Sequence, residues 1–381
     1  MKELLFKGFE VELFTGDDAG NHIGCSALVA KKFGDFVKEP DQRNLEYITQ
    51  PEKKYEHLKE LLLEPRRRLR DWLKLRNLTI LPGSTLSLGD SKQFQRSDLS
   101  NPYHEFIEKN YGTSVVTASI HINLGLEELP SIFSALRLVR CEAALFLALS
   151  ASSPFLDGVS TGVHSQRWLQ FPKTPKKVPL FIDHIEYVKW IEEQLRTGLM
   201  CNERHLWTAV RPNGEKRPYK LNRLELRICD LITDCDLLLA ITALLELRVL
   251  SLINNPNELD PVKKSNLNLV ELADLCDSNE EAAAKDSLDA ILHHWLDGKE
   301  ISCREWISQL MEQVEPLAID LDILPILAPI HQVLEKGNQS MQWLKSFKEG
   351  VPIPFLLKSS IKEMEIEEHA SGQGLLDEKF S

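Results

Sequence analysis

Three β-prone segments of the sequence each carry two polar side chains that are two residues apart. The pairs are Glu10 with Glu12, His121 with Asn123, and Glu225 with Arg227. Because side chains alternate between the faces of a strand, both members of a pair point to one side. Carboxylates gathered on one face repel each other unless a cation lies between them. The spacing predicts one sheet with a metal- or anion-binding face, although a single Glu-x-Glu is also typical of an exposed edge strand with solvated glutamates.

A second group of candidate residues lies in the Gly/Ser/Thr-rich segment 150–167, which ends in Arg167. Backbone N–H groups, hydroxyls such as those of Thr161 and Ser165, and a fixed cation together suit an anion. The same composition is equally typical of a connecting loop. Neither the P-loop pattern nor GxGxxG occurs in the chain. A further basic stretch, residues 204–223, suits a small anionic substrate better than a polymer.

Apolar periodicity indicates the elements that must position these side chains. Strands are expected at residues 2–14, 45–49 (which adds Glu46), 115–124 and 224–228. Helices are expected at residues 53–78, 130–147, 185–195, 230–253 and 280–296. The basic residues Arg66, Arg67, Arg68 and Arg70 are assigned to the solvated face of the first helix, and Asp230 is expected to cap the fourth.

This order of elements predicts an α+β fold with one domain over residues 1–361, rich in sheet up to residue 230 and helical from 231. The acidic, Gly-containing tail at residues 362–381 is expected to be disordered.

Composition narrows the class of protein. The chain has 381 residues, of which 43% are hydrophobic, so it can bury a large core. Its net charge of −12 argues against a nucleic-acid binder, which would need a clustered positive field. The seven cysteines are scattered without a CxxC pair, which is typical of reduced thiols. No signal peptide opens the chain and no apolar run reaches the length of a membrane span, so a soluble cytoplasmic protein is expected.

The motifs resemble, in this order, the carboxylate–amine ligase family of glutamate–cysteine ligases, particularly its cyanobacterial type. The matching segments are GFEVE (8–12), LEYITQP (45–51), SIHINLG (119–125), LSASSPFLDGVSTGVHSQR (149–167) and ELRICD (225–230). The segment 149–167 is the most specific of these. The resemblance covers residues 1 to about 250, and the helical remainder more weakly.

Such a family implies a glutamine-synthetase-like fold, in which an antiparallel sheet lines the active site and helices pack on its other face. It also implies a reaction in which ATP phosphorylates the γ-carboxylate of L-glutamate and the amine of L-cysteine displaces the phosphate. The implied partners are these small molecules, with neither nucleic acid nor a membrane. Mg²⁺ prefers oxygen ligands and bridges phosphates, which suits Glu10, Glu12, Glu46 and Glu225. His121 is a softer ligand that favours Mn²⁺, or it orients a carboxylate, and a core histidine is the alternative.

The resemblance further implies that Arg167 and Arg227 are catalytic cations for the γ-phosphate and the substrate carboxylate. It implies contacts to ATP from Arg167, Ser165 and Thr161. Two departures stand out: Asn123 occupies a position where many relatives have a second histidine, and residues 152–156 replace their Asn-Ser-Pro-Phe-Trp.

Two other hypotheses stay open. One is an ATP-dependent glutamate ligase of the same family that uses another amine. The other is a non-catalytic binding protein with this fold, against which the intact Glu10, Glu12, Glu225 and Arg167 argue. A guanidino kinase fits less well because its reactive-cysteine neighbourhood is not recognisable in the sequence.

Overall fold

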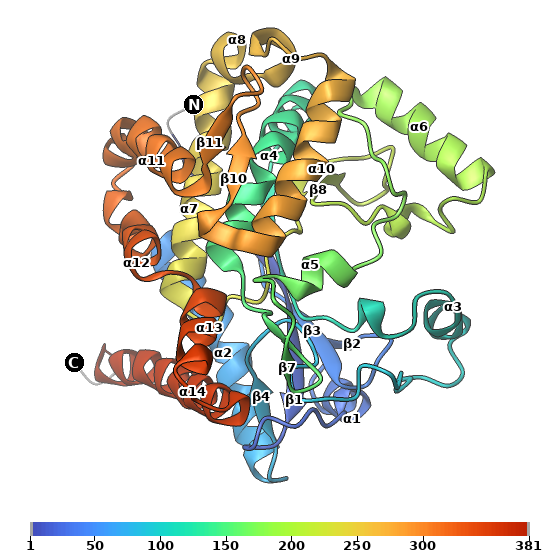
Figure 1. The fold of residues 1–381 in the computed structure, drawn as a ribbon, viewed down its shortest axis with the longest axis vertical. Helices are drawn as coiled ribbons and strands as arrows, with labels where there is room; N and C mark the ends of the chain where they lie inside the picture. Colours follow the sequence, from blue (N-terminus) through green and yellow to red (C-terminus); the bar gives the residue numbers. More distant parts are fainter. Residues whose placement is uncertain (1–2, 379–381) are drawn as a thin grey trace.

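A seven-stranded antiparallel sheet lies at the centre of the fold. The structure is a computed structural model that describes the backbone of residues 3–378 and the side chains of residues 3–370. The strand order is β2-β3-β1-β5-β9-β8, and β4 pairs with the far end of β1 (Figure 1). The strands are β1 (Lys7–Gly16), β2 (Phe36–Lys38), β3 (Asn44–Ile48), β4 (Thr79–Leu81), β5 (Ile120–Gly125), β8 (Val210–Asn213) and β9 (Arg223–Leu226).

Strand β1 shows why the sheet has one apolar and one polar face. Its Phe9, Val11 and Leu13 are buried, whereas Glu10 and Glu12 between them are half-buried. This alternation is the two-residue period of a strand that packs one face on a core. The apolar face therefore contacts the helices, and both carboxylates point to the opposite side.

The register of the sheet places the predicted polar residues next to one another. Glu10 lies opposite His121 on β5, and Glu12 lies opposite Glu46 on β3. Asn123 on β5 lies opposite Glu225 on β9. The predicted strands thus share one sheet, and the predicted α+β class with an antiparallel sheet and helices on its other face is confirmed.

Long helices cover the apolar face. Helix α4 packs against β8, β9 and α7, and α10 lies along α4, as Figure 1 shows in its upper half. Helices α4 and α7 are apolar on nearly every side, which is typical of helices that are buried all round. The helices are α1 (Ser26–Lys32), α2 (Tyr55–Lys74), α3 (Pro102–Tyr111), α4 (Leu129–Ser150), α5 (Gln166–Gln170), α6 (His184–Arg196), α7 (Cys235–Asn254), α8 (Pro256–Leu259), α9 (Pro261–Lys264), α10 (Leu269–Asp286), α11 (Cys303–Asp320), α12 (Ala328–Lys336), α13 (Gln339–Lys348) and α14 (Ile353–Glu378).

The expected helix at residues 280–296 is confirmed only up to residue 286 and is wrong beyond it. Helix α10 ends at Asp286 because Ser287 adopts a φ of +53°, which breaks the helical path. The chain then forms a small hairpin of β10 (Ile291–His293) and β11 (Glu300–Ser302). A second short hairpin, β6 (Phe155–Leu156) with β7 (Val159–Ser160), lies within the Gly/Ser/Thr-rich segment.

Arg66 and Arg70 are buried, so their assignment to a solvated helix face is also wrong. Both lie on α2 and pair with the carboxylate of Glu368 on α14, with Arg66 Nε 3.2 Å from Glu368 Oε1. Arg70 also donates to Thr79 Oγ1 at 2.6 Å, and Arg66 to the carbonyl of Thr233 at 3.0 Å. Removal of charges from water is tolerated here because each charged group has several partners.

The expectation of a disordered tail from residue 362 is wrong for the described residues. Helix α14 runs to Glu378 and lies beside α2 at the lower left of Figure 1. Besides Glu368, its Glu365 pairs with Lys74 of α2. The acidic residues that suggested disorder are therefore the partners of the α2 arginines and lysine. Residues 379–381 lie outside the described residues.

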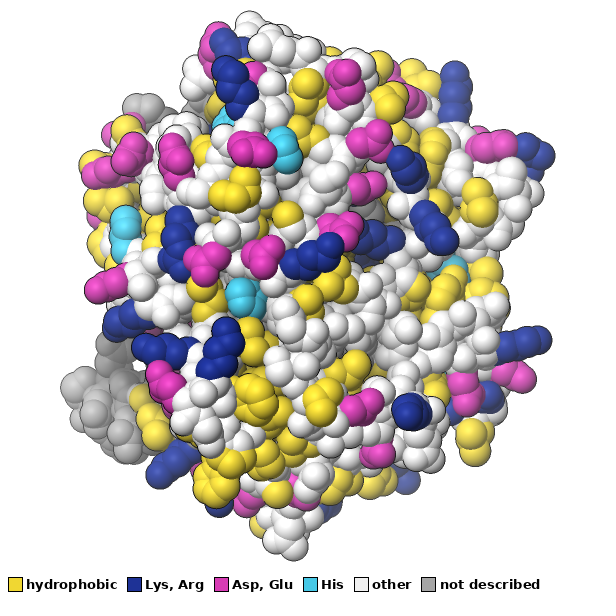
Figure 2. Space-filling view, viewed as in Figure 1, with side chains coloured by type: hydrophobic (Ala, Val, Ile, Leu, Met, Phe, Trp, Pro, Cys, Tyr) yellow, Lys and Arg dark blue, Asp and Glu magenta, His cyan; other side chains and the backbone are white. Residues whose placement is uncertain are grey.

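The surface is mixed in charge. On the face seen in Figure 2, acidic and basic side chains are interspersed among apolar ones, a pattern typical of a solvated surface. Over the described residues, none of the helices is both long and apolar enough to cross a membrane.

Glu368→Gln should destabilise the fold strongly, because it leaves the two buried guanidinium groups of Arg66 and Arg70 without their carboxylate. We expect the free energy of unfolding, measured by urea denaturation, to fall by about 3–5 kcal/mol. The matched control is Glu363→Gln, an exposed position on the same helix, which should change stability by no more than about 0.5 kcal/mol. Equal effects of the two substitutions would contradict the assignment of α14 to a buried ion-pair network.

Candidate active site

The polar face of the sheet forms one wall of a cavity of about 1140 Å³. Strands β1, β3 and β5 supply Glu10, Glu12, Glu46 and His121 to this wall, and Arg227 directly follows β9. The opposite wall comes from α3 and from the segment 203–219. The cavity therefore has carboxylates on the sheet and mainly basic and aromatic side chains facing them.

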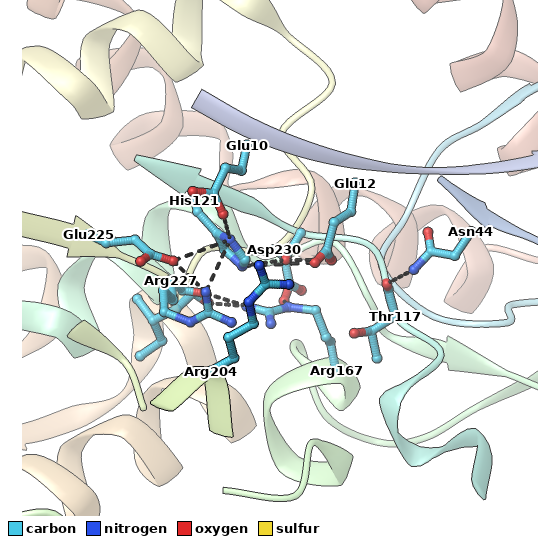
Figure 3. A network of polar contacts seen from close by, with 12 residues as sticks. Glu10, Glu12, Asn44, Thr117, His121, Arg167, Arg204, Glu225, Arg227 and Asp230 are labelled. Carbon is cyan, nitrogen blue, oxygen red and sulfur yellow. Dashed lines mark hydrogen bonds and ion pairs between the residues drawn. The ribbon is translucent and has the colours of Figure 1, made fainter. Parts of the chain in front are cut away.

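Glu10, His121 and Glu225 lie close enough to share one metal ion. Their ligand atoms all lie within 4.8 Å of one another. His121 Nδ1 is 3.0 Å from Glu10 Oε2 and 3.6 Å from Glu225 Oε1 (Figure 3). Two carboxylates and an imidazole form a donor set that divalent cations bind in proteins. These residues fit a divalent cation.

Glu225 is fully buried and is surrounded by positive charge. Its carboxylate accepts hydrogen bonds from Arg211 Nε at 2.7 Å, from Arg211 Nη2 at 3.0 Å and from Asn213 Nδ2 at 2.6 Å. Arg227 Nη1 also donates to it. Burial alone would raise the pKa of Glu225, but the guanidinium groups of Arg211 and Arg227 hold that pKa well below its usual range. Glu225 is therefore an anion held in one position.

Glu10 lies between His121 and an amide. Asn123 Nδ2 donates to Glu10 Oε1 at 3.3 Å, and Arg223 Nε donates to Asn123 Oδ1 at 3.0 Å. Burial and the nearby Glu225 act to raise the pKa of Glu10, but hydrogen bonding to His121 leaves it below its ordinary value. Asn123 thus links Glu10 to Arg223.

A second group of carboxylates lies beyond Glu12. Ser119 Oγ donates to Glu12 Oε2 at 2.7 Å. Burial and the negative charge of Glu12 raise the pKa of Glu39 to about 7. Burial and the proximity of Glu39 raise the pKa of Glu46 well above its usual range. Crowded carboxylates with raised pKa values are a second place at which added positive charge would be stabilising.

Of the residues predicted to contact ATP, the structure brings only Arg167 to the cavity wall. Arg167 Nε donates to Asp230 Oδ1 at 2.8 Å, and its Nη2 donates to the carbonyl of Ile228. Ser165 Oγ donates to the same carboxylate oxygen at 2.8 Å and accepts from Trp168 N. Thr161 Oγ1 bonds to the carbonyl of Pro154. Both hydroxyls are thus engaged within the protein, and neither lines the cavity.

Asp230 does not cap the helix that follows it, because Asp234 is the N-cap of α7. Asp230 is fully buried and accepts hydrogen bonds from Ser152 N and Ser153 Oγ as well as from Ser165 and Arg167. The Asp230 carboxylate therefore connects the Gly/Ser/Thr-rich segment to the chain that follows β9, and it fixes the position of Arg167.

Several residues of the site were not singled out from the sequence. Arg211 and Asn213 lie two residues apart on β8, so the same spacing rule would have found them. From the sequence, Arg211 was predicted only as part of the basic stretch 204–223. Glu39 directly follows the short strand β2. The two-residue spacing rule does not identify it, and nothing in its local sequence indicates that its side chain lies next to Glu46.

A second hollow adjoins the first at Glu10, Ile48 and Arg223. It has a volume of about 1010 Å³ and is lined mainly by apolar side chains. Leu4, Phe6 and Leu126 contribute to it. The polar cavity and the mainly apolar one therefore border each other, with Glu10 at their junction.

Comparisons of the sequence and of the fold both find similarity to glutamate–cysteine ligases. The family model of glutamate–cysteine ligase family 2 matches residues 6–371. A curated protein of Solibacter usitatus is 26% identical over 249 residues, which cover 65% of this chain and 62% of that protein. One of Herpetosiphon aurantiacus is 25% identical over 249 residues, covering 64% and 61%. Both carry the provisional name glutamate–cysteine ligase 2. The matches thus span about three fifths of these relatives' length.

Two solved structures share the fold at 15% sequence identity. A glutamate–cysteine ligase of Francisella tularensis in complex with AMP has a TM-score of 0.73, and the match covers 99% of this chain and 94% of that one. A bifunctional glutathione synthetase of Pasteurella multocida has a TM-score of 0.74, covering 96% of this chain and 53% of that one. Because the family model extends over nearly the whole sequence, the chain belongs to glutamate–cysteine ligase family 2.

Proposed function

We propose that the protein is an ATP-dependent ligase that joins the γ-carboxylate of L-glutamate to the amine of L-cysteine, the first step of glutathione synthesis. The terminal phosphoryl group of ATP passes to the γ-carboxylate, giving γ-glutamyl phosphate and ADP. The amine then attacks the acyl carbon, phosphate leaves and the amine loses a proton. The observation that carries this proposal is the cluster of Glu10, His121 and Glu225, which lies beside arginines in one cavity.

The cation of this reaction is proposed to be Mg²⁺, with Mn²⁺ as the alternative. Glu10, Glu225 and His121 would hold this ion, whereas Glu12 and Glu46, which the sequence also suggested as metal ligands, lie outside that cluster. A bound cation supplies positive charge to phosphate oxygens. Since arginines already neutralise Glu225, the remaining carboxylates provide most of the negative charge that attracts a cation.

Arg227 is the proposed contact for the transferring phosphoryl group. Glu225 accepts a hydrogen bond from Arg227 and so fixes its guanidinium. Arg227 Nη1 lies 3.3 Å from His121 Nδ1, next to the proposed metal ligands. Phosphoryl transfer brings two anions together, and a preformed cation lowers the repulsion between them. Arg167 is proposed to act chiefly as a positioning residue, because Asp230 already takes up its charge.

The apolar hollow is the proposed site of the adenine ring. A purine needs apolar surface on its faces, and the junction at Glu10 would bring its phosphates to the metal ligands. The bound AMP in the Francisella tularensis structure supports a nucleotide site in this fold. The free cysteines fit a reducing compartment, so we propose the cytoplasm as its location.

A ligase of the same family that uses another amine is the second candidate. The residues described above act on glutamate and the nucleotide, and they are the same whichever amine attacks.

The reaction predicts a trappable acyl phosphate. Protein with ATP, Mg²⁺ and L-glutamate should form ADP slowly, L-cysteine should accelerate this strongly, and hydroxylamine should yield glutamyl hydroxamate. Chromatography of the nucleotides and a colour assay for hydroxamate would measure both. AMP and pyrophosphate in place of ADP and phosphate would instead indicate an adenylate mechanism and would exclude this proposal.

Glu10→Gln should remove most of the activity without loss of the fold, because it deletes one ligand charge at constant volume. We expect kcat at saturating Mg²⁺ to fall on the order of 100-fold or more, with an unchanged melting temperature. Glu335→Gln, at an exposed position on α12, is the control and should behave like the unmodified protein. Full activity of the Glu10 variant would refute its role as a metal ligand.

Arg227→Lys should lower kcat more than it weakens glutamate binding, because an ammonium group cannot reproduce the planar fork that contacts Glu225 and the phosphoryl group. The expected loss in kcat is on the order of 100-fold, measured by steady-state kinetics at varied glutamate. A rise in the KM for glutamate with unchanged kcat would move Arg227 to substrate binding alone.

A further inference from the structure

Arg204 differs from the other arginines of the cavity because its guanidinium makes no hydrogen bond or ion pair with the described residues. It lies on the short 3-10 helix η2 (Glu203–His205), is exposed, and lines the cavity opposite the sheet. Arg211, Arg217 and Arg227 pair with Glu225, and Arg167 pairs with Asp230. Arg223 has no carboxylate partner among the described residues, but its guanidinium is engaged by the amide oxygens of Asn123 and Asn222.

The backbone of Arg204 is nevertheless firmly held. Its N–H donates to Asn202 Oδ1 at 2.8 Å, and its carbonyl accepts from Arg211 Nη1 at 3.3 Å. Arg211 Nη1 also donates to the carbonyl of Leu206 at 3.1 Å, and Arg211 pairs with the buried Glu225. The loop that carries Arg204 is therefore anchored to the proposed metal ligands, whereas the side chain remains available.

The next residue, His205, fixes the surroundings of Arg204. Its buried ring packs 4.9 Å from Trp207 and 5.6 Å from Phe106, measured between ring centroids, and its Nε2 lies 3.2 Å from the hydroxyl of Tyr103. These aromatic contacts connect η2 with α3. Arg204 therefore projects from a packed wall and not from a free loop.

The direction of the side chain is visible in Figure 3, where Arg204 extends from its loop toward the space near Glu12 and Arg227. Tyr103 links this space with the outer carboxylates. Burial and the negative charge of Glu39 raise the pKa of Tyr103 to about 12, and the positive charge of Arg204 acts in the opposite direction. Tyr103 thus lies within electrostatic reach of both Glu39 and Arg204.

This arrangement separates two charges in a way that matches an amino acid. A free amino acid carries an ammonium and a carboxylate about 3 Å apart, and each needs an opposite charge when it leaves water. The carboxyl groups of Glu12, Glu39 and Glu46 line one side of the cavity, where a positive charge such as an ammonium lowers the repulsion among them. Arg204 provides a positive charge that no described group of the protein neutralises. An amine acceptor without a carboxylate would have no group for Arg204 to bind.

We propose that Arg204 binds the carboxylate of the amine acceptor and so selects acceptors that carry one. This inference rests on the proposed ligase function and assigns a specificity determinant to it. Arg204 is not required for phosphorylation of glutamate, because the groups proposed for that step are Arg227 and the proposed metal ligands.

The test compares L-cysteine with cysteamine, which has the same thiol and amine but lacks the carboxylate. With ATP, Mg²⁺ and saturating L-glutamate, the unmodified protein should have the higher kcat/KM for L-cysteine. Arg204→Gln should lower kcat/KM for L-cysteine by about 10- to 100-fold, while kcat/KM for cysteamine stays unchanged. L-2-Aminobutyrate and propylamine form a second pair without the thiol and should show the same difference.

The control variant is Arg196→Gln, an exposed arginine of α6 that pairs with Glu193 and is not part of the cavity wall. It should leave both acceptors unaffected. Equal losses with L-cysteine and cysteamine in the Arg204 variant would overturn the proposal, since they would place Arg204 in glutamate or nucleotide binding. An unchanged reaction with L-cysteine would overturn it as well. If the unmodified protein ligates neither acceptor, the proposed function itself fails and this inference falls with it.

Discussion

The buried charge of Glu225 is the constraint on which the rest of the site depends. A carboxylate without access to water is unstable unless donors surround it, and here the donors come from neighbouring residues of β8 and β9. The Glu225 carboxylate holds Arg227 in position through a hydrogen bond and pairs β8 with β9 through Arg211 and Asn213. Through Arg211 it also anchors the loop at residues 203–206. The site is therefore preformed by its own ion pairs, which reduces the reorganisation needed when charged substrates bind.

Acidic and basic side chains gather in different parts of the polar face of the sheet. Carboxylates with raised pKa values gather around Glu39 and Glu46, arginines gather around Glu225, and Glu10 with His121 lies between them. For the proposed ligase reaction, the site must attract several anions and yet hold cations among them. Because the arginines and the carboxylates are separated on one rigid surface, the same site can attract anions and hold cations.

The sequence predicted the parts of this arrangement that depend on local spacing. The two-residue period identified Glu10, Glu12, His121 and Glu225, and antiparallel pairing then places them side by side because alternation leaves a side chain only two faces. The prediction failed where a partner lies far away in the chain. Arg66 and Arg70 appeared solvated because their carboxylate is about 300 residues distant, and the helix that carries this carboxylate has the composition of a disordered tail. Glu39 and Asp230 were missed or misassigned because their roles depend on contacts that no local pattern encodes.

The pairing of α2 with α14 also bears on how the chain reaches its final structure. The guanidinium groups of Arg66 and Arg70 belong to the interior, but the carboxylate that neutralises them is supplied by residue 368. During synthesis on the ribosome, α2 leaves the exit tunnel long before Glu368 is made, and two unpaired charges oppose its burial until then. The α2–α14 contact cannot form before Glu368 has been made, so we expect the burial of Arg66 and Arg70 to be completed only after α14 has emerged.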